Sequence, residues 1–162
     1  MADAASLSTE EWAFWDAWMR AQRLLAGEVD RVLQRDFGIS KAEFSILVTL
    51  RAVPGGRLRV TELAGSLGWE KSRVAHQLTR MERRGLLERS EAGAAGRRTG
   101  IALKPSGEEV VERAIRGHAR TIRRLALDRL SAEQIAAIGA WSNDLIDHLA
   151  AASSERGAAA DA

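Results

Sequence analysis

The chain has 162 residues, of which 46% are hydrophobic and 28% charged, as in one compact domain with helical extensions. It contains no cysteine, which excludes disulfides, thiol sensing and cysteine metal sites. The net charge is only +2, so any attraction to a polyanion has to come from local clustering of charge. The sequence shows no apolar run of membrane-spanning length and no signal-peptide pattern, so we expect a cytoplasmic protein without membrane contact.

Four helix starts are predicted from capping boxes, in which a serine is followed three residues later by Glu or Gln. The pairs are Ser8 with Glu11, Ser40 with Glu43, Ser106 with Glu109, and Ser131 with Gln134. The predicted helices cover residues 9–37, 41–52, 105–130 and 132–151, and residues 152–162 are expected to form a loose tail.

Apolar spacing predicts which side of each long helix faces inward. In the first helix these residues are Trp15, Trp18, Met19, Leu25, Val29, Val32 and Leu33; in the helix from 105 they are Val111, Ile115, His118, Ile122 and Leu125. The first helix is too long to bury its whole length against one small domain. We therefore expect another chain to cover the excess, which predicts a homodimer.

Two shorter helices are predicted between residues 60 and 84. Thr61 is expected to be the N-cap of the first, which Gly68 ends in a left-handed conformation. The second runs from about Glu70 to Arg84 and faces inward with Val74, Leu78 and Met81. On its opposite side lie only donors and cations: Ser72, Arg73, His76, Thr79, Arg80 and Arg83. Such a surface suits the major groove of DNA, where Arg recognises guanine and phosphates require cations.

A β-hairpin is predicted to follow, with strands at 86–89 and 99–103 joined by a loop of small residues that ends in Arg97 and Arg98. A loop of this kind is suited to reach a minor groove or a phosphate. Residues 57–59 are expected to add a short strand. Helix, turn, basic helix and hairpin in this order predict a winged helix-turn-helix in a mainly α protein with a small β-wing.

The sequence resembles the MarR family of bacterial transcriptional regulators. The motifs that carry the resemblance are Glu70-Lys71-Ser72-Arg73-Val74, Leu78-Thr79-Arg80-Met81-Glu82-Arg83-Arg84-Gly85-Leu86-Leu87, Arg97, and Leu103-Lys104-Pro105-Ser106-Gly107. In organisation the resemblance covers residues 8–150. The chain has Ala95 where the family often carries an acid before the wing arginine, and Lys104 where it often has Thr.

The resemblance implies a dimeric, DNA-binding repressor of a palindromic operator. Its parts would be an N-terminal dimerisation helix (1–39), a winged helix-turn-helix (40–104), C-terminal dimerisation helices (105–151) and a flexible tail (152–162). The DNA-contacting residues expected are Thr61, Lys71, Ser72, Arg73, His76, Arg80, Arg97 and Arg98.

Proteins resembling this family often bind small aromatic or anionic effectors. Trp15, Trp18 and His118 are the candidates for such a pocket, while their alternative role is to fill the dimer or domain core.

The two other classes of function to consider are an enzyme or metalloprotein and a protein-binding module. His76, His118 and His148 lie far apart in the sequence, and no nucleophile, phosphate-loop or dinucleotide motif is present, so we expect no enzyme, metal site or cofactor. The alternative is a winged-helix module that binds protein and not DNA. The cationic surface argues against it, since protein interfaces favour aromatic and aliphatic anchors.

Overall fold

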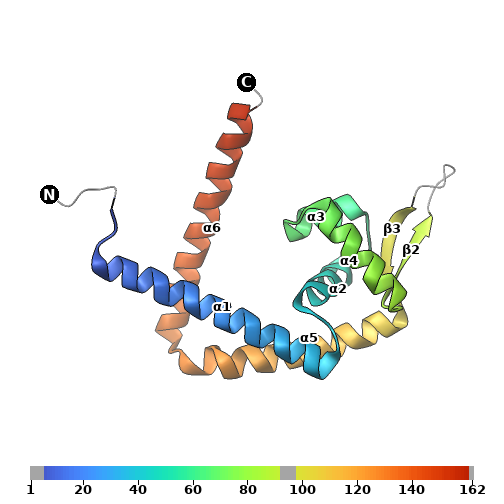
Figure 1. Ribbon diagram of the computed structural model, residues 1–162, viewed down its shortest axis with the longest axis horizontal. Coiled ribbons are helices and arrows are strands. Elements are labelled where there is room, and N and C mark those ends of the chain that lie inside the picture. Colours follow the sequence, from blue (N-terminus) through green and yellow to red (C-terminus); the bar gives the residue numbers. More distant parts are fainter. Residues whose placement is uncertain (1–5, 92–97, 161–162) are drawn as a thin grey trace. The chain divides into compact units, whose positions relative to one another are not determined.

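The computed structural model describes the backbone of residues 6–91 and 98–160, and the side chains of 6–90 and 100–153. The chain divides into two compact units, Met1–Thr121 and Ile122–Ala162. The first unit holds the winged helix-turn-helix and the helices that support it; the second holds the C-terminal helix (Figure 1).

The first unit is built mainly from helices around a small sheet (Figure 1). In chain order it contains α1 (Thr9–Phe37), α2 (Lys41–Ala52), β1 (Arg57–Leu58), α3 (Val60–Leu67), α4 (Lys71–Arg83), β2 (Leu87–Glu91), β3 (Arg98–Leu103) and α5 (Pro105–Leu125) as far as Thr121. The order confirms the predicted mainly α fold with a β-wing.

The sheet is antiparallel, with β3 in the centre between β1 and β2. Leu58 pairs with Ile101, and Leu87 with Leu103. The side chain of Arg57 lies against Gly100 of β3, because a Cβ atom added to Gly100 would stand 2.7 Å from Arg57 Cδ. Arg57 Nη1 also donates a hydrogen bond to Ser90 Oγ on β2. Arg57 thus connects the two outer strands across the central one.

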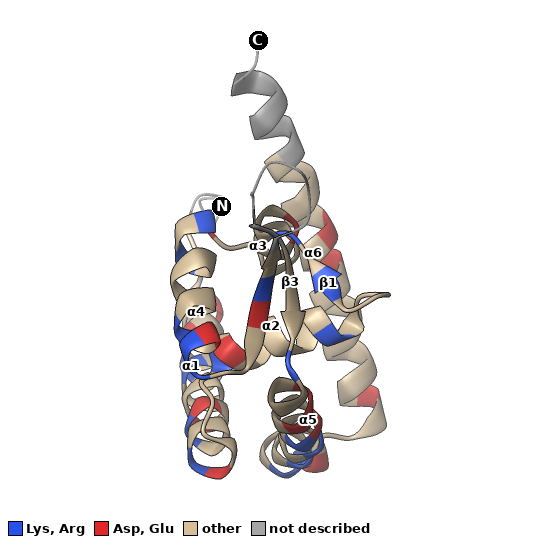
Figure 2. Cartoon of the chain, turned by 90° about the vertical axis from the view of Figure 1, so that its right-hand side faces the viewer, with Lys and Arg blue, Asp and Glu red and all other residues tan. Residues whose placement is uncertain are grey.

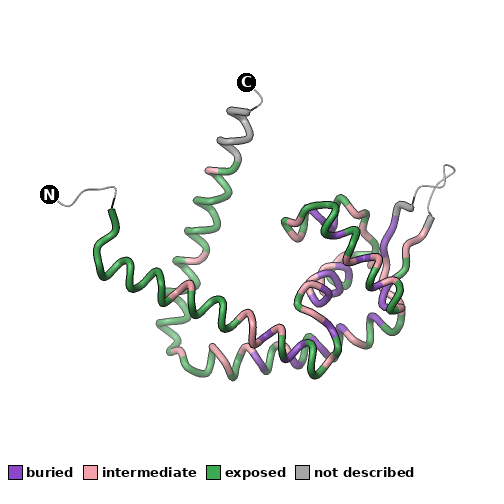
Figure 3. The backbone as a smooth tube through the Cα atoms, viewed as in Figure 1, coloured by how far each residue is buried: buried purple, intermediate pink, exposed green. Residues whose placement is uncertain are grey.

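The hydrophobic core of this unit lies where α2, α3 and α4 meet the sheet and the adjoining ends of α1 and α5 (Figure 3). Its fully buried side chains include Leu33, Ile39, Ile46, Leu47, Leu50, Leu63, Val74, Leu78, Met81, Leu87, Ile101 and Val111. Every element of the winged helix-turn-helix except the two-residue β1 contributes to this list, so the motif is held as one packed body.

Three of the four predicted capping boxes are present, at Ser8, Ser40 and Ser131. The box at Ser106 is wrong: α5 begins at Pro105, so Ser106 lies inside the helix, and its Oγ donates to Gly85 O. The N-cap assigned to Thr61 is also wrong. Helix α3 begins at Val60 because Glu62 accepts the backbone amide of Arg59, which makes Arg59 the N-cap residue.

The predicted inward side of α5 is partly wrong. The buried residues of α5 are Gly107, Val111, Ala114, Gly117 and Thr121, whereas Ile115 is 37% exposed. At Gly117 a Cβ atom would stand 2.2 Å from the ring of Phe37, at the end of α1. Small residues of α5 therefore pack against the rest of this unit, and a prediction based on large apolar side chains does not identify them. Helix α5 also ends at Leu125, short of the predicted Leu130.

The second unit contains a short 3₁₀ turn at Leu127–Arg129 and the long helix α6 (Ala132–Ala160), which continues beyond the predicted end at residue 151. Several large apolar side chains on α6 are exposed, among them Ile138, Leu145 and Leu149. No helix among the described residues is both long enough and apolar enough to span a bilayer.

We predict that Gly107→Ala destabilises the protein. A Cβ atom there would stand 2.0 Å from the carbonyl oxygen of Leu86, a backbone atom that already accepts a hydrogen bond from the amide of Lys104. We expect the free energy of unfolding, measured with urea, to fall by about 1–3 kcal/mol, as for other overpacked sites. The control is Gly65→Ala in α3, where the added atom meets open space. Equal effects at both positions would contradict this account.

Candidate nucleic-acid interface

Helix α4 presents its cationic side to solvent because its other side is fully buried. Val74, Leu78 and Met81 each have an exposed fraction of 0%. The side chains of Lys71, Ser72, Arg73, His76, Arg80 and Arg83 are all exposed. Figure 2 shows basic residues along this helix. Burial of Val74, Leu78 and Met81 thus turns the predicted DNA-contacting residues of α4 towards solvent, and none of these residues is acidic.

Thr79 does not share the role predicted for this side of the helix. Its hydroxyl donates to Ala75 O at 3.0 Å and accepts a hydrogen bond from Arg89 Nη2 at 2.9 Å. Arg89, on strand β2, also lies 3.4 Å from a carboxylate oxygen of Glu82, and its side chain is only 15% exposed. Arg89 therefore connects strand β2 of the wing to α4, the predicted recognition helix, and Thr79 is one of its two partners there.

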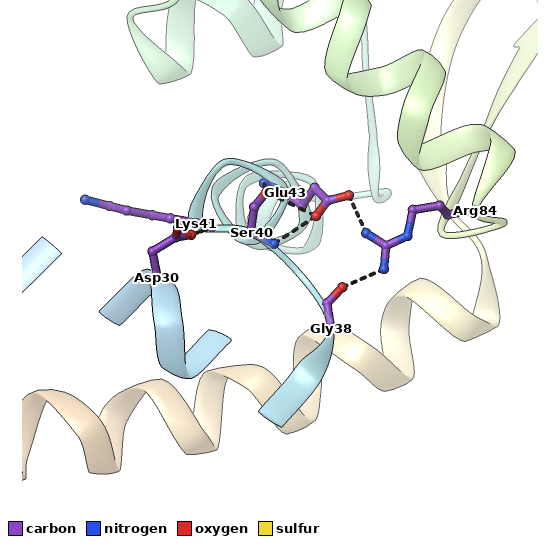
Figure 4. A network of polar contacts seen from close by, with 6 residues as sticks. All are labelled: Asp30, Gly38, Ser40, Lys41, Glu43 and Arg84. Carbon is purple, nitrogen blue, oxygen red and sulfur yellow. Dashed lines mark hydrogen bonds and ion pairs between the residues drawn. The ribbon is translucent and has the colours of Figure 1, made fainter. Parts of the chain in front are cut away.

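A buried carboxylate connects the end of α4 to the junction of α1 and α2 (Figure 4). Glu43 is 4% exposed and accepts hydrogen bonds from the amide and hydroxyl of Ser40, at 2.8 and 3.1 Å. Arg84 donates to Glu43 Oε1 and to the carbonyl of Gly38, both at 2.6 Å. The Arg84 guanidinium thus neutralises the buried charge and joins three helix ends.

Asp30 makes a second connection to the start of α2 (Figure 4). One of its oxygens accepts the backbone amide of Lys41 at 2.6 Å, and the other accepts from Gln34 Nε2 at 2.6 Å. A carboxylate at the first turn of α2 also favours the positive end of the helix dipole. Together these contacts hold α1 to the winged helix-turn-helix.

Two hollows flank the start of α4. One, of about 660 Å³, lies between α1, α2 and α4 and includes the cations Lys41, Arg73 and Arg80. The other, also of about 660 Å³, lies over the turn between α3 and α4 and brings Thr61 together with Lys71 and Ser72. Trp69 lines both.

Thr61 is exposed and lines the same hollow as Lys71 and Ser72, although it does not cap α3. Sequence reasoning did not single out Trp69. Its ring lies under the guanidinium of Arg73, with 4.3 Å between Arg73 Cζ and the ring centroid. Trp69 lies in the turn between α3 and α4, before the N-cap residue Glu70, so helical periodicity gives no signal for the pair.

The two predicted wing arginines are not placed by the structure. Arg97 lies outside the described residues, and for Arg98 only the backbone is described, as the first residue of β3. Two arginines of the described part of the sheet contact other residues of the motif: Arg57 on β1 binds Ser90, and Arg89 on β2 binds Thr79.

The three candidate effector residues lie on α1 and α5, away from the two hollows described here. Trp15 is 44% exposed and Trp18 half-buried on α1. His118, on α5, packs with its ring centroid 4.8 Å from that of Phe44, and its Nδ1 is buried without a partner in the described structure. Burial, and secondarily the nearby charge of Lys41, lowers the pKa of His118, so the neutral imidazole is favoured.

No group of three His, Asp or Glu side chains with metal-binding geometry occurs within the described residues. The site is therefore characterised by donors and cations on an exposed helix, a hairpin wing beside it, and a core that fixes their relative position. These features define a winged helix-turn-helix regulator.

Comparison with known proteins identifies the family. The MarR family model matches residues 37–98. Sco3205 of Streptomyces coelicolor, a MarR family transcriptional regulator solved in complex with DNA, is 33% identical, with 89% of this chain and 94% of that chain covered and a TM-score of 0.81. AbsC, a MarR family regulator of the same organism, is 27% identical, with coverage of 91% and 99% and a TM-score of 0.82. A search of curated protein sequences finds no significant match. The chain belongs to the MarR family.

We predict that Arg84→Ala destabilises the protein by about 1–3 kcal/mol, because it leaves the buried Glu43 carboxylate without its cation. Urea unfolding measures the change. Adding Glu43→Gln in the Arg84→Ala background should restore part of the loss, since a neutral amide needs no counter-charge. The control is Arg35→Ala, which removes an exposed ion pair with Asp36 and should have little effect. A second loss on adding Glu43→Gln would contradict the assignment.

Proposed function

We propose that this protein is a homodimeric, sequence-specific DNA-binding transcriptional repressor that acts in the cytoplasm and is released by a small-molecule effector. The observation that carries the DNA-binding part is the exposed, acid-free side of α4, fixed outward by the buried seam of Val74, Leu78 and Met81. Membership of the MarR family supports the same conclusion, since the related Sco3205 was solved in complex with DNA.

The proposed contacts divide by chemistry. Arg73 and His76, both exposed on α4, would read base edges, and Ser72 would donate to a base or to an adjacent phosphate. Lys71 and Arg80 supply charge for the phosphate backbone, and Thr61 offers a hydroxyl to a phosphate from the preceding helix. The wing would add Arg97 and Arg98 at the neighbouring groove.

We predict that Arg73→Ala lowers affinity for the preferred duplex by about 1–3 kcal/mol and relaxes preference at one base pair. Lys71→Ala should instead weaken binding to all sequences alike and reduce the slope of log affinity against log salt by about one. Fluorescence anisotropy with labelled duplexes selected from a randomised library measures both effects.

The control is Arg113→Ala, which removes an exposed cation of α5 away from the recognition helix. An unchanged affinity for Arg73→Ala would refute its assignment. Absence of any salt-sensitive DNA binding by the unmodified protein would refute the function and favour a protein-binding module.

Dimer formation is supported by exposed apolar side chains at both ends of the chain. On α1, Trp12 and Trp15 are 52% and 44% exposed, and on α6, Leu145 and Leu149 are 38% and 54% exposed. Apolar surface of this extent marks an interaction site. A two-fold dimer would present two copies of α4 to half-sites about 10 base pairs apart or more, and hence to a palindromic operator.

We predict that Leu145→Glu produces monomers and weakens binding to a palindromic duplex, because a buried charge opposes association. Analytical ultracentrifugation measures the mass, and anisotropy measures the binding. The matched control is Asp144→Glu, which retains the charge of the neighbouring exposed position. A dimer of unchanged affinity in the Leu145→Glu variant would place the interface elsewhere.

Release by an effector is proposed through Trp15, Trp18 and His118. An indole ring offers a stacking surface for an aromatic ligand, and a neutral imidazole accepts or donates one hydrogen bond. Such a ligand releases DNA only to the extent that it prefers the unbound conformation, and the coupling is reciprocal. A compound that releases DNA must therefore bind more weakly in calorimetric titration when DNA is present. Equal affinity in both titrations would contradict the mechanism.

A further inference from the structure

The turn between α3 and α4 holds Trp69 in a fixed position. Gly68 takes the left-handed conformation that ends α3, and the backbone amide of Trp69 donates to Ala64 O at 3.0 Å. The indole is half-buried and packs against the hydrophobic core. Because both its backbone and its ring are held by the body of the motif, Trp69 provides a rigid platform at the start of the recognition helix.

Arg73 lies on this platform with its guanidinium 4.3 Å from the centre of the ring. Stacking uses the flat face of a guanidinium and leaves the N–H donors around its edge available. No ion pair of Arg73 with a carboxylate is found among the described side chains. The arginine is thus restrained in direction while its hydrogen-bonding edge remains available.

We propose that Trp69 is a positioning residue for sequence readout: it orients Arg73 before DNA arrives and thereby sharpens recognition of one base pair without contacting that base pair itself. The proposal rests on the proposed function, in which Arg73 reads a base edge. A bidentate contact to guanine requires two N–H groups in a fixed plane, and an arginine that rotates freely must lose that freedom on binding. A ring that already restrains the guanidinium lowers this entropic cost.

We expect loss of the Trp69 ring to reduce discrimination between base pairs more than it reduces affinity for DNA in general. Contacts to phosphate depend on charge, which Trp69 does not alter, so the salt dependence of binding should remain as in the unmodified protein. Loss of the ring should weaken binding to the preferred duplex about 3- to 20-fold, the range expected for one cation–π contact. Duplexes that already carry the wrong base pair at that position should be affected far less.

The experiment is a double-mutant cycle with the full-length protein. The probe is a duplex selected by the unmodified protein from a randomised library, together with its single base-pair variants. Affinities are measured by anisotropy for Trp69→Leu, Trp69→Phe, Arg73→Ala and the double variant Trp69→Leu/Arg73→Ala. Trp69→Phe is the conservative control, since it retains an aromatic face, and circular dichroism verifies that each variant is folded.

We expect Trp69→Leu to reduce discrimination at the same base pair as Arg73→Ala and to have no further effect once Arg73 is absent. Trp69→Phe should retain most of the discrimination. An equal loss from Trp69→Leu in both backgrounds, or a loss at a different base pair, would overturn the proposal, because Trp69 would then act on its own. If Trp69→Leu does not fold, Trp69→Met takes its place, alone and combined with Arg73→Ala, because methionine fills a half-buried site without an aromatic face. Failure of the unmodified protein to bind any duplex would instead overturn the proposed function, and this inference with it.

Discussion

The arrangement of the candidate interface depends on the burial of one side of α4. Three side chains, Val74, Leu78 and Met81, are removed completely from solvent by α2, α3 and the sheet. Each such burial contributes about 1.5–3 kcal/mol, so rotating the helix about its axis would expose far more apolar surface than any surface contact could offset. The direction in which Arg73 and Arg80 point is therefore set by the core and not by the surface charges themselves.

Polar contacts then restrain α4 along its length. Near its beginning, the Trp69 ring lies against Arg73; in its second half, Arg89 of the wing reaches Thr79 and Glu82; after its end, Arg84 reaches Glu43. These contacts join the recognition helix to its own turn, to the sheet and to the junction of α1 and α2. The Arg84 guanidinium thus ties the end of α4 to the junction of α1 and α2.

The periodicity of α4 was sufficient to predict both its buried and its exposed side, since a regular helix with large apolar residues has only one way to face a core. The inward side of α5 could not be predicted in this way, because the close contacts are made by Gly107 and Gly117, which carry no hydrophobic signal. Nor did periodicity predict that Arg84 binds Glu43. The two residues are 41 positions apart and meet only after the chain has folded. Local patterns therefore identified which face of the helix is exposed, but not the long-range contacts that hold it.

The two-residue length of β1 has a consequence for the behaviour of the protein at high concentration. An uncovered strand edge offers unpaired amides and carbonyls to other molecules, and long, flat, apolar edges promote aggregation. At the β1 edge of the sheet the strand is limited to Arg57 and Leu58, and both Arg57 and the following Arg59 are exposed and charged. Electrostatic repulsion between two such edges, together with the few hydrogen bonds they could exchange, disfavours growth of the sheet from one molecule into the next. The brevity of β1 thus disfavours pairing between molecules at this edge of the sheet.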